Sequence, residues 1–390
     1  RELIYSEINK SDDKKLKILV SSFVDDLDYY QWSANAKAIP NTIISNGSHL
    51  DMINHLQKIL PKQIIPLKMS FFRNGYTKND FYQLHRFIEG FWVFIYGLTE
   101  TASSKTENFW IDCCKKVNEG EGKPYDEVLK DLIEAAEKLP AFKTFKLQNW
   151  RGAMADPQLL YDQERKITFL LRKIEHDLNP SITANKQLND PKLLNVEHIL
   201  PKNLRKTGTY IAGDGGTQWQ IHFSKDKSQE HLENLWLLGN MTLLAAKPNR
   251  KISNYTFQYK CENGYRPHDN TKDKKKSSYT DEKAGMRFSD LSLNIDTDAG
   301  LYTLYSANDW TPETIGKRNR QLVCSIIEIF DIFGFFKNEL IENHWGDKKD
   351  NPIEVFKETG KTITKNQFEI AEKKADSDGK DVFTIINEEF

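Results

Sequence analysis

The stretch Val196-Glu197-His198-Ile199-Leu200-Pro201 decides the fold of the second half of the chain, together with Gly239-Asn240-Met241-Thr242-Leu243-Leu244. In the first stretch, apolar residues flank Glu-His and a proline ends the run, which is typical of a short strand. Met241 to Leu244 is a second short apolar run. Pro248 suits a first helical turn, because its φ is fixed and no N–H is needed there. We therefore expect a strand, a loop, a second strand and a helix from about Pro248 to Lys260.

Glu197, His198 and Asn249 bring a base and two oxygen ligands into this frame. Hydrolysis of a phosphodiester needs a base that deprotonates water and a cation that neutralises charge on the phosphate and the leaving oxygen. An imidazole at its ordinary pKa is largely neutral at pH 7, so His198 can be that base. Glu197 leaves the opposite face of the strand, but it can reach a metal from a twisted strand end. A carboxylate with the amide of Asn249 forms a hard ligand set that suits Mg²⁺.

These segments resemble HNH endonucleases, and specifically the HNH domain of the GmrSD/SspE-type modification-dependent restriction proteins. The family's pattern is a His-Ile-x-Pro strand, then Gly-Asn-x-Thr-Leu-Leu, then Asn, then Ser-Asn-x-x-Phe-x-x-Lys. The chain carries these segments at His198–Pro201, Gly239–Leu244, Asn249 and Ser253–Lys260. Asn240 and Asn249 lie nine residues apart, which is also the spacing of two asparagines in the HNH domains of RNA-guided Cas nucleases.

The resemblance implies a mainly α protein with a small ββα-metal (HNH/His-Me finger) nuclease core, α+β overall. It gives the catalytic set His198, Asn240 and Asn249, in which His198 is the general base and Asn240 braces the loop. Glu197 and Asn249 would hold Mg²⁺ or Mn²⁺. The family often has Asp at the position of Glu197, where this chain carries the longer side chain. Trp310–Ile315 followed by Arg318 resembles the family's closing helix.

Each of these residues also has a structural interpretation. An isolated histidine is more often structural, Glu197 can be a solvated strand residue, and Asn240 can satisfy a turn. Residues 202–234 form a Gly-rich insertion between the strands, which either closes on DNA or is a surface loop with buried aromatics. Within it, His231 is a candidate for second-shell support of the site.

Charge points to one local patch for nucleic acid. The 390 residues carry a net charge of −1, so no global basic field is present. Residues 247–287 hold eleven Lys or Arg and five Asp or Glu, a net of +6. The expected phosphate-binding residues are Arg250, Lys251 and Lys260 on the site helix and Lys274, Lys275 and Lys276 in a loop run. Alone, such a run is usually just solvated.

The chain divides into three predicted regions. Residues 1–185 carry helical apolar stripes over 16–30, 50–60, 81–98, 128–136 and 156–178, with a capping box at Thr77 and Asp80. Residues 186–340 form the predicted nuclease domain, closed by an apolar helix over 313–340. Residues 341–390 are a C-terminal extension of unknown role, with candidate strands at Thr362–Thr364 and Val382–Ile386.

Several functional classes are disfavoured. The four cysteines form no Cys-x-x-Cys pair, so neither a structural zinc site nor a disulfide framework is predicted, and we expect a cytoplasmic protein. The longest apolar run, Phe91–Leu98, is too short to cross a bilayer. Neither a P-loop nor the Asp-Gly-Gln-Gln-Arg motif of the family's N-terminal domain occurs. The first residue is Arg1 rather than Met, and the resemblance implies a nucleotide-hydrolysing domain or subunit outside this chain.

The predicted function is a metal-dependent HNH endonuclease or nickase in bacterial restriction of foreign (phage) DNA, and the expected substrate is double-stranded DNA. The family responds to modified bases or to backbone phosphorothioation, and the sequence does not choose between them. The first alternative is a catalytically silent HNH-fold module that binds DNA or a partner subunit. The second is a ribonuclease with the same site. The helical region is a linker, a sensor or a dimer interface.

Overall fold

A computed structural model divides the chain into two compact units, residues 1–96 with 101–143 and residues 97–100 with 144–390. The structure describes the following residues: 13–35, 38–44, 47–98, 101–119, 123–141, 160–178, 194–204, 219, 222–223, 228–245, 249, 252–261, 304, 309–330, 354–355, 358–359, 361, 363 and 365–390.

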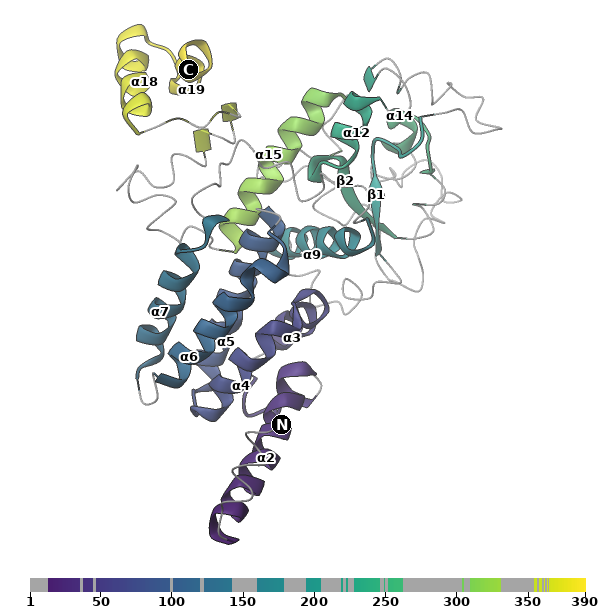
Figure 1. Cartoon of the computed structure of the whole chain (residues 1–390). Helices are drawn as coiled ribbons and strands as arrows, with labels where there is room; N and C mark the ends of the chain where they lie inside the picture. The colour runs from purple at the N-terminus through teal and green to yellow at the C-terminus, as the bar shows by residue number, and fades with distance from the viewer. Residues whose placement is uncertain are drawn as a thin grey trace. The chain divides into compact units, whose positions relative to one another are not determined.

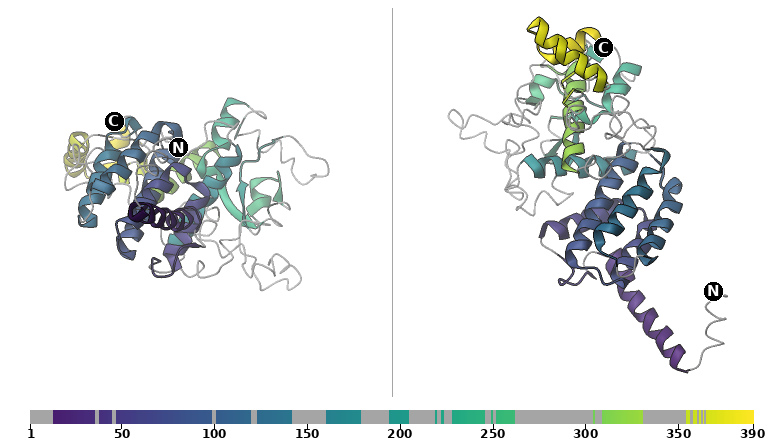
Figure 2. Two further views of the ribbon diagram at one scale, coloured as in Figure 1. Left: turned by 60° about the horizontal axis from the view of Figure 1, so that its bottom comes forward. Right: turned by 90° about the vertical axis from the view of Figure 1, so that its left-hand side faces the viewer.

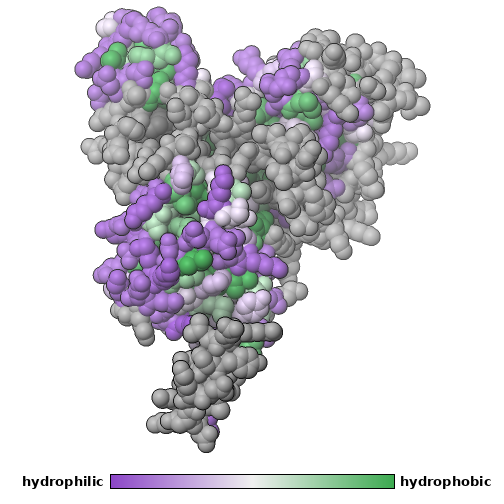
Figure 3. Space-filling model, viewed as in Figure 1, coloured by the Kyte–Doolittle hydropathy of each residue, from purple (hydrophilic) through white to green (hydrophobic). Residues whose placement is uncertain are grey.

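The described part of unit 1 is helical. Helices α3 to α7 lie side by side in both sets of views (Figures 1 and 2). Its face seen in Figure 3 is mainly hydrophilic, as expected for the outer side of a helical bundle. In chain order the elements are α2 (Asp13–Ala34), α3 (Gly47–Ile59), η2 (Lys62–Ile64), α4 (Ile65–Arg73), α5 (Lys78–Phe91), η3 (Trp92–Leu98), η4 (Ser103–Thr106), α6 (Glu107–Glu119) and α7 (Tyr125–Glu137).

Helix α5 shows how the sequence fixes these elements. The capping box is confirmed: Asp80 N donates to Thr77 Oγ1, and the Asp80 carboxylate accepts from Thr77 N at 2.8 Å. The apolar stripe from Phe81 onward is buried. It continues past α5 as the π-helix η3, whose residues from Trp92 to Tyr96 are all buried. A helix that is apolar on every side lies inside a core, and this one does.

Unit 2 is organised on a two-stranded antiparallel sheet, β1 (Leu194–His198) with β2 (Met241–Ala245). Glu197 pairs with Thr242, and His198 with Met241. Its other elements are α9 (Leu160–Leu178), α12 (Gln229–Leu235), η7 (Leu238–Asn240), α14 (Phe257–Lys260), α15 (Pro312–Ile329), α18 (Lys365–Asp378) and α19 (Val382–Glu389). Helix α9 contacts both strands and α15, so it lies with the sheet, although the sequence places it in the region 1–185.

The helix expected from Pro248 to Lys260 is not continuous. Ser253 has φ +33°, outside the helical region and unusual for a residue other than glycine. A new helix, α14, starts at Phe257, where Thr256 Oγ1 accepts from Tyr259 N at 3.2 Å. The break shortens the helix to one turn and sets the direction from which Lys260 approaches β1.

Two predictions at the C-terminal end are corrected. Helix α15 ends at Ile329 rather than continuing to 340, and residues 331–350 lie outside the described part. Val382–Ile386 is not a strand but the start of α19, because Asp381 caps it by accepting from Phe383 N and Thr384 N. Helices α18 and α19 share a small core of their own, which includes Phe368 and Ile385.

No helix among the described residues has the length and apolar character needed to cross a membrane.

Candidate active site

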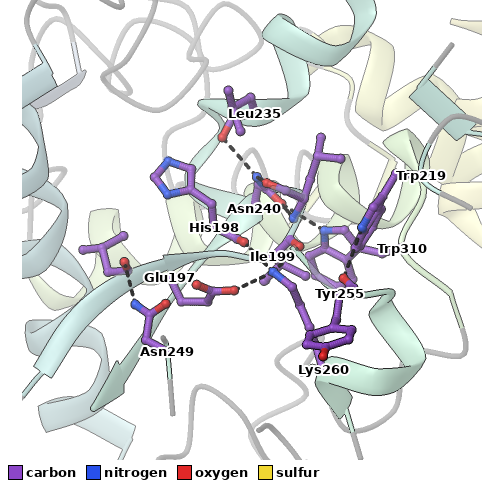
Figure 4. A network of polar contacts seen from close by, with 12 residues as sticks. Glu197, His198, Ile199, Trp219, Leu235, Asn240, Asn249, Tyr255, Lys260 and Trp310 are labelled. Carbon is purple, nitrogen blue, oxygen red and sulfur yellow. Dashed lines mark hydrogen bonds and ion pairs between the residues drawn. The ribbon is translucent and has the colours of Figure 1, made fainter. Parts of the chain in front are cut away.

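His198 is the last residue of β1, and its ring projects to a different side of the strand from the Glu197 carboxylate (Figure 4). The ring is half-buried, and its Nε2 atom is buried with no hydrogen-bond partner among the described residues. Burial, together with the charges of Lys202 and Lys260, lowers the pKa of His198 to about 3. The imidazole is therefore neutral at pH 7 and is able to accept a proton.

Glu197 lies on the other face of the sheet and is buried against Lys260. Lys260 Nζ donates to Glu197 Oε1 at 2.6 Å and to the carbonyl oxygens of His198 and Ile199 at 3.0 Å each. Burial lowers the pKa of Lys260, while Glu197 acts in the opposite direction. The three hydrogen bonds use all three donors of the ammonium, so α14 is fastened to the end of β1 through this one side chain.

This geometry differs from the expected phosphate-binding role of Lys260. The side chain is fully buried, and all three of its donors are engaged inside the protein. A phosphate contact needs an accessible donor, so Lys260 acts as a structural cation instead. The other expected phosphate-binding residues, Arg250, Lys251, Lys274, Lys275 and Lys276, lie outside the described residues.

Asn240 is fully buried and joins three segments of the site. Its Oδ1 accepts from Leu200 N at 2.7 Å and from Trp310 Nε1 at 3.0 Å. Its Nδ2 donates to the carbonyl oxygens of Leu200 and Leu235, at 3.1 and 3.0 Å. These four bonds use both donors and both lone pairs of the amide, so Asn240 braces the chain just after His198 and has no capacity left for substrate.

Asn249 is half-buried, and its Nδ2 donates to Val196 O at 3.3 Å. This bond holds the amide beside β1 and leaves Oδ1 with no hydrogen bond among the described residues. An oxygen in this state is a suitable ligand for a hard cation. The described residues contain no group of three or more His, Cys, Asp or Glu side chains placed to hold a metal. The expected ligands, Glu197 and Asn249, include only one residue of these four types, so they would not form such a group.

His231 supports the turn that follows the site. It is fully buried on α12, and its Nε2 donates to Pro201 O at 3.0 Å, which fixes the backbone three residues after His198. Ser228 caps α12 by accepting from His231 N. His231 therefore acts on the backbone of the site and does not touch the imidazole of His198 among the described contacts.

Helix α15 clamps the loop that carries Asn240. Arg318 is buried and donates to the carbonyl oxygens of Gly239 and Met241 at 2.7 Å each, while Asn319 Oδ1 accepts from Gly239 N at 2.9 Å. A Cβ on Gly239 would lie 2.3 Å from Ile315 O. The loop can approach α15 this closely only with glycine at that position.

Two residues beside His198 were missed by sequence reasoning. The Trp236 ring meets the His198 ring edge-on, with centroids 5.2 Å apart, and Lys202 Nζ lies 5.3 Å from the Trp236 centroid. Lys202 begins the insertion 202–234 and Trp236 follows its end, and no local pattern marks either residue. The only signal available in the sequence was that Lys202 follows the His-Ile-x-Pro segment directly.

Residues 150–324 match the family model of the C-terminal domain of GmrSD restriction endonucleases. This segment is a GmrSD-type C-terminal domain. The GmrSD-type segment contains α9, both strands, α14 and most of α15, which are the elements that hold His198, Asn240, Asn249 and Lys260 in place. It also begins well before His198, where the segments that carry the sequence resemblance start. Comparison with curated proteins and with solved structures gives no match.

Proposed function

We propose that the GmrSD-type segment is an HNH nuclease that hydrolyses phosphodiester bonds in DNA, with His198 as the general base. The main support is the state of His198: a neutral imidazole whose buried Nε2 has no partner among the described residues, at the end of a strand braced by Asn240. The family match adds that the fold segment occurs in restriction endonucleases. By the same reasoning, the biological setting is bacterial restriction of foreign DNA.

In the proposed reaction, a water molecule donates a hydrogen bond to His198 Nε2 and passes its proton to the ring as its oxygen attacks phosphorus. The bond from phosphorus to the leaving 3′ oxygen breaks as the new bond forms, and the leaving oxygen keeps the electron pair and takes up a proton from solvent. An isolated base with a low pKa accepts a proton weakly. A bound phosphodiester is anionic, however, and an anion close to the ring raises its pKa toward the working range. Asn240, Lys260 and His231 hold the backbone from His198 to Pro201, so the ring is positioned before substrate arrives.

The donor set fits a divalent cation. Asn249 presents an amide oxygen, and the Glu197 carboxylate can bind an ion while it accepts from Lys260, because it offers about four lone pairs on two oxygens. We propose these two residues as the ligands of Mg²⁺ or Mn²⁺. When bound, such an ion would neutralise charge on the phosphate and the leaving oxygen.

One observation favours a second candidate, a silent module that only binds DNA or a partner subunit. Lys260 already places a buried cation against Glu197, and a second cation would have to share the carboxylate with it. If this ion pair excludes the metal, the fold binds without cutting.

Incubation with supercoiled plasmid separates the two candidates. The nuclease is expected to produce relaxed or linear DNA with Mg²⁺ or Mn²⁺ and none with EDTA. The silent module is expected to retard the same DNA in a gel-shift under both conditions without cutting it. An RNA competitor that is cleaved in preference to DNA would assign the site to a ribonuclease instead.

A further inference from the structure

Two buried polar atoms without partners lie on neighbouring rings at the end of β1. They are His198 Nε2 and Trp236 Nε1, and neither has a hydrogen-bond partner among the described residues. The two rings meet edge-on at a centroid distance of 5.2 Å and an interplanar angle of 89°. Buried donors and acceptors in native proteins nearly always have partners, so two such atoms on touching rings call for an explanation.

A cation accompanies the two rings. Lys202 is exposed, and its ammonium lies over the Trp236 ring at 5.3 Å from the centroid. Its charge is also felt at His198, where it opposes protonation of the ring. The three side chains therefore form one cluster, which contains one cation, one unused N–H donor and one unused imidazole nitrogen.

The cluster is held by the fold. Lys202 follows Pro201, whose carbonyl accepts from His231, and Trp236 is the C-cap residue of α12, with its backbone N–H bonded to Asn234 O. Both side chains therefore start from backbone that is held by hydrogen bonds. Binding therefore has to order only the side chains, because the backbone that carries them is already in place.

We propose that Lys202 and Trp236 form a phosphate subsite beside His198, in which the indole N–H and the ammonium donate to oxygens of the DNA backbone. Both groups are donors, which selects an anion with acceptor oxygens. The subsite lies directly beside His198. A phosphodiester held by Lys202 and Trp236 would therefore lie next to the imidazole nitrogen that receives the proton of water. The proposal rests on the proposed nuclease function and deepens it.

Trp236→Phe and Lys202→Met test the two donors separately. Phenylalanine keeps an aromatic ring against His198 and Lys202 but removes the N–H. Methionine keeps most of the Lys202 side chain but removes the charge, and Lys202→Arg restores it. Lys130→Met, an exposed lysine on α7 in unit 1, is the matched control for loss of one positive charge. Unfolding midpoints of all variants confirm that they remain folded.

The measurement is the affinity for a fluorescently labelled DNA duplex in EDTA, by anisotropy, across a range of salt concentrations. Lys202→Met is expected to bind about 3- to 10-fold more weakly and to lower the slope of log K against log salt by about 0.9, the value for one lost phosphate contact. Trp236→Phe is expected to weaken binding by about 3- to 10-fold with the slope unchanged, because the N–H carries no charge. Lys202→Arg should restore the slope.

The inference fails alone if the wild-type protein binds and cuts DNA while both variants match Lys130→Met in affinity and slope. If the wild-type protein neither binds the duplex nor cuts plasmid with metal, the proposed function fails, and the subsite falls with it.

Discussion

His198 and its neighbours act through the positions of single atoms, and Asn249 is the simplest of them to test. Its amide nitrogen is anchored to Val196 O, which leaves the oxygen for a cation. Asn249→Ala is expected to raise the Mg²⁺ concentration needed for half-maximal cleavage by about 10- to 100-fold. Asn249→Asp keeps an oxygen and should lose much less. A metal titration of plasmid cleavage checks this, and an unchanged Mg²⁺ requirement in Asn249→Ala would remove the residue from the site.

The buried ion pair between Lys260 and Glu197 is expected to contribute to the stability of the fold. Lys260→Met leaves the buried Glu197 carboxylate without its cation, and breaking a buried pair on one side costs about 3–5 kcal/mol. Adding Glu197→Met is expected to recover part of this loss, because no buried charge then remains. Urea unfolding measures both variants, with Lys130→Met as the control for an exposed lysine. A Lys260→Met protein as stable as the control would mean that the pair does not form.

The close packing of the Gly239 loop against helix α15 can be tested by its effect on stability. Gly239→Ala is expected to lower the free energy of unfolding by more than about 2 kcal/mol, because the new Cβ would overlap backbone atoms of α15. Gly316 on the same helix is the control: its nearest neighbour to a new Cβ is 3.9 Å away, so Gly316→Ala should be neutral or stabilising by up to about 1 kcal/mol. Equal stability of the two variants would show that the loop does not pack as described.

At the scale of elements, the sequence predicted those helices and strands whose formation depends on neighbouring residues in the chain. The capping box of α5 and the two strands form where the pattern indicates them. The break at Ser253 could not be predicted, since it depends on how α14 docks on β1. Val382–Ile386 has the apolar residues of a strand, but the cap at Asp381 and contact with α18 favour a helix.

The site shows the same limit. The motif singled out His198, Asn240 and Asn249 as candidate site residues, because their order and spacing can be read directly along the chain. It could not give the Lys260–Glu197 pair, whose partners are 63 residues apart, nor the contact of Trp310 with Asn240 across 70 residues. Both contacts are made by chain segments that meet only after folding. Without the Glu197 contact in view, Lys260 was predicted to be an accessible cation that binds phosphate.

At the scale of the whole molecule, buried histidines in unit 1 make stability depend on pH. His49 and His85 share a hydrogen bond of 3.1 Å between His49 Nε2 and His85 Nδ1, near the buried Lys68. Burial, with the charge of Lys68, lowers the pKa of His49 to about 4 and that of His85 well below its usual value. Because the folded pKa is lowered, the stabilisation is fully present above about pH 6.5 and is lost as pH falls toward 4.

Unfolding free energies measured between pH 7.5 and 4.5 are therefore expected to fall with pH, and His49→Gln should flatten this dependence. The variant should still lose stability at pH 7.5 through the missing His85 contact. An equally steep fall in the wild-type and His49→Gln proteins would place the acid sensitivity elsewhere.

Chemical rescue of His198→Ala tests whether His198 removes the proton from water. Plasmid cleavage with Mg²⁺ is compared for the wild-type protein and for His198→Ala, each with and without added imidazole. The variant is expected to be slower by about 10²–10⁴-fold, the usual contribution of a general base, and imidazole should restore part of the rate only in the variant. A His198→Ala protein that cuts as fast as wild type would contradict the claim.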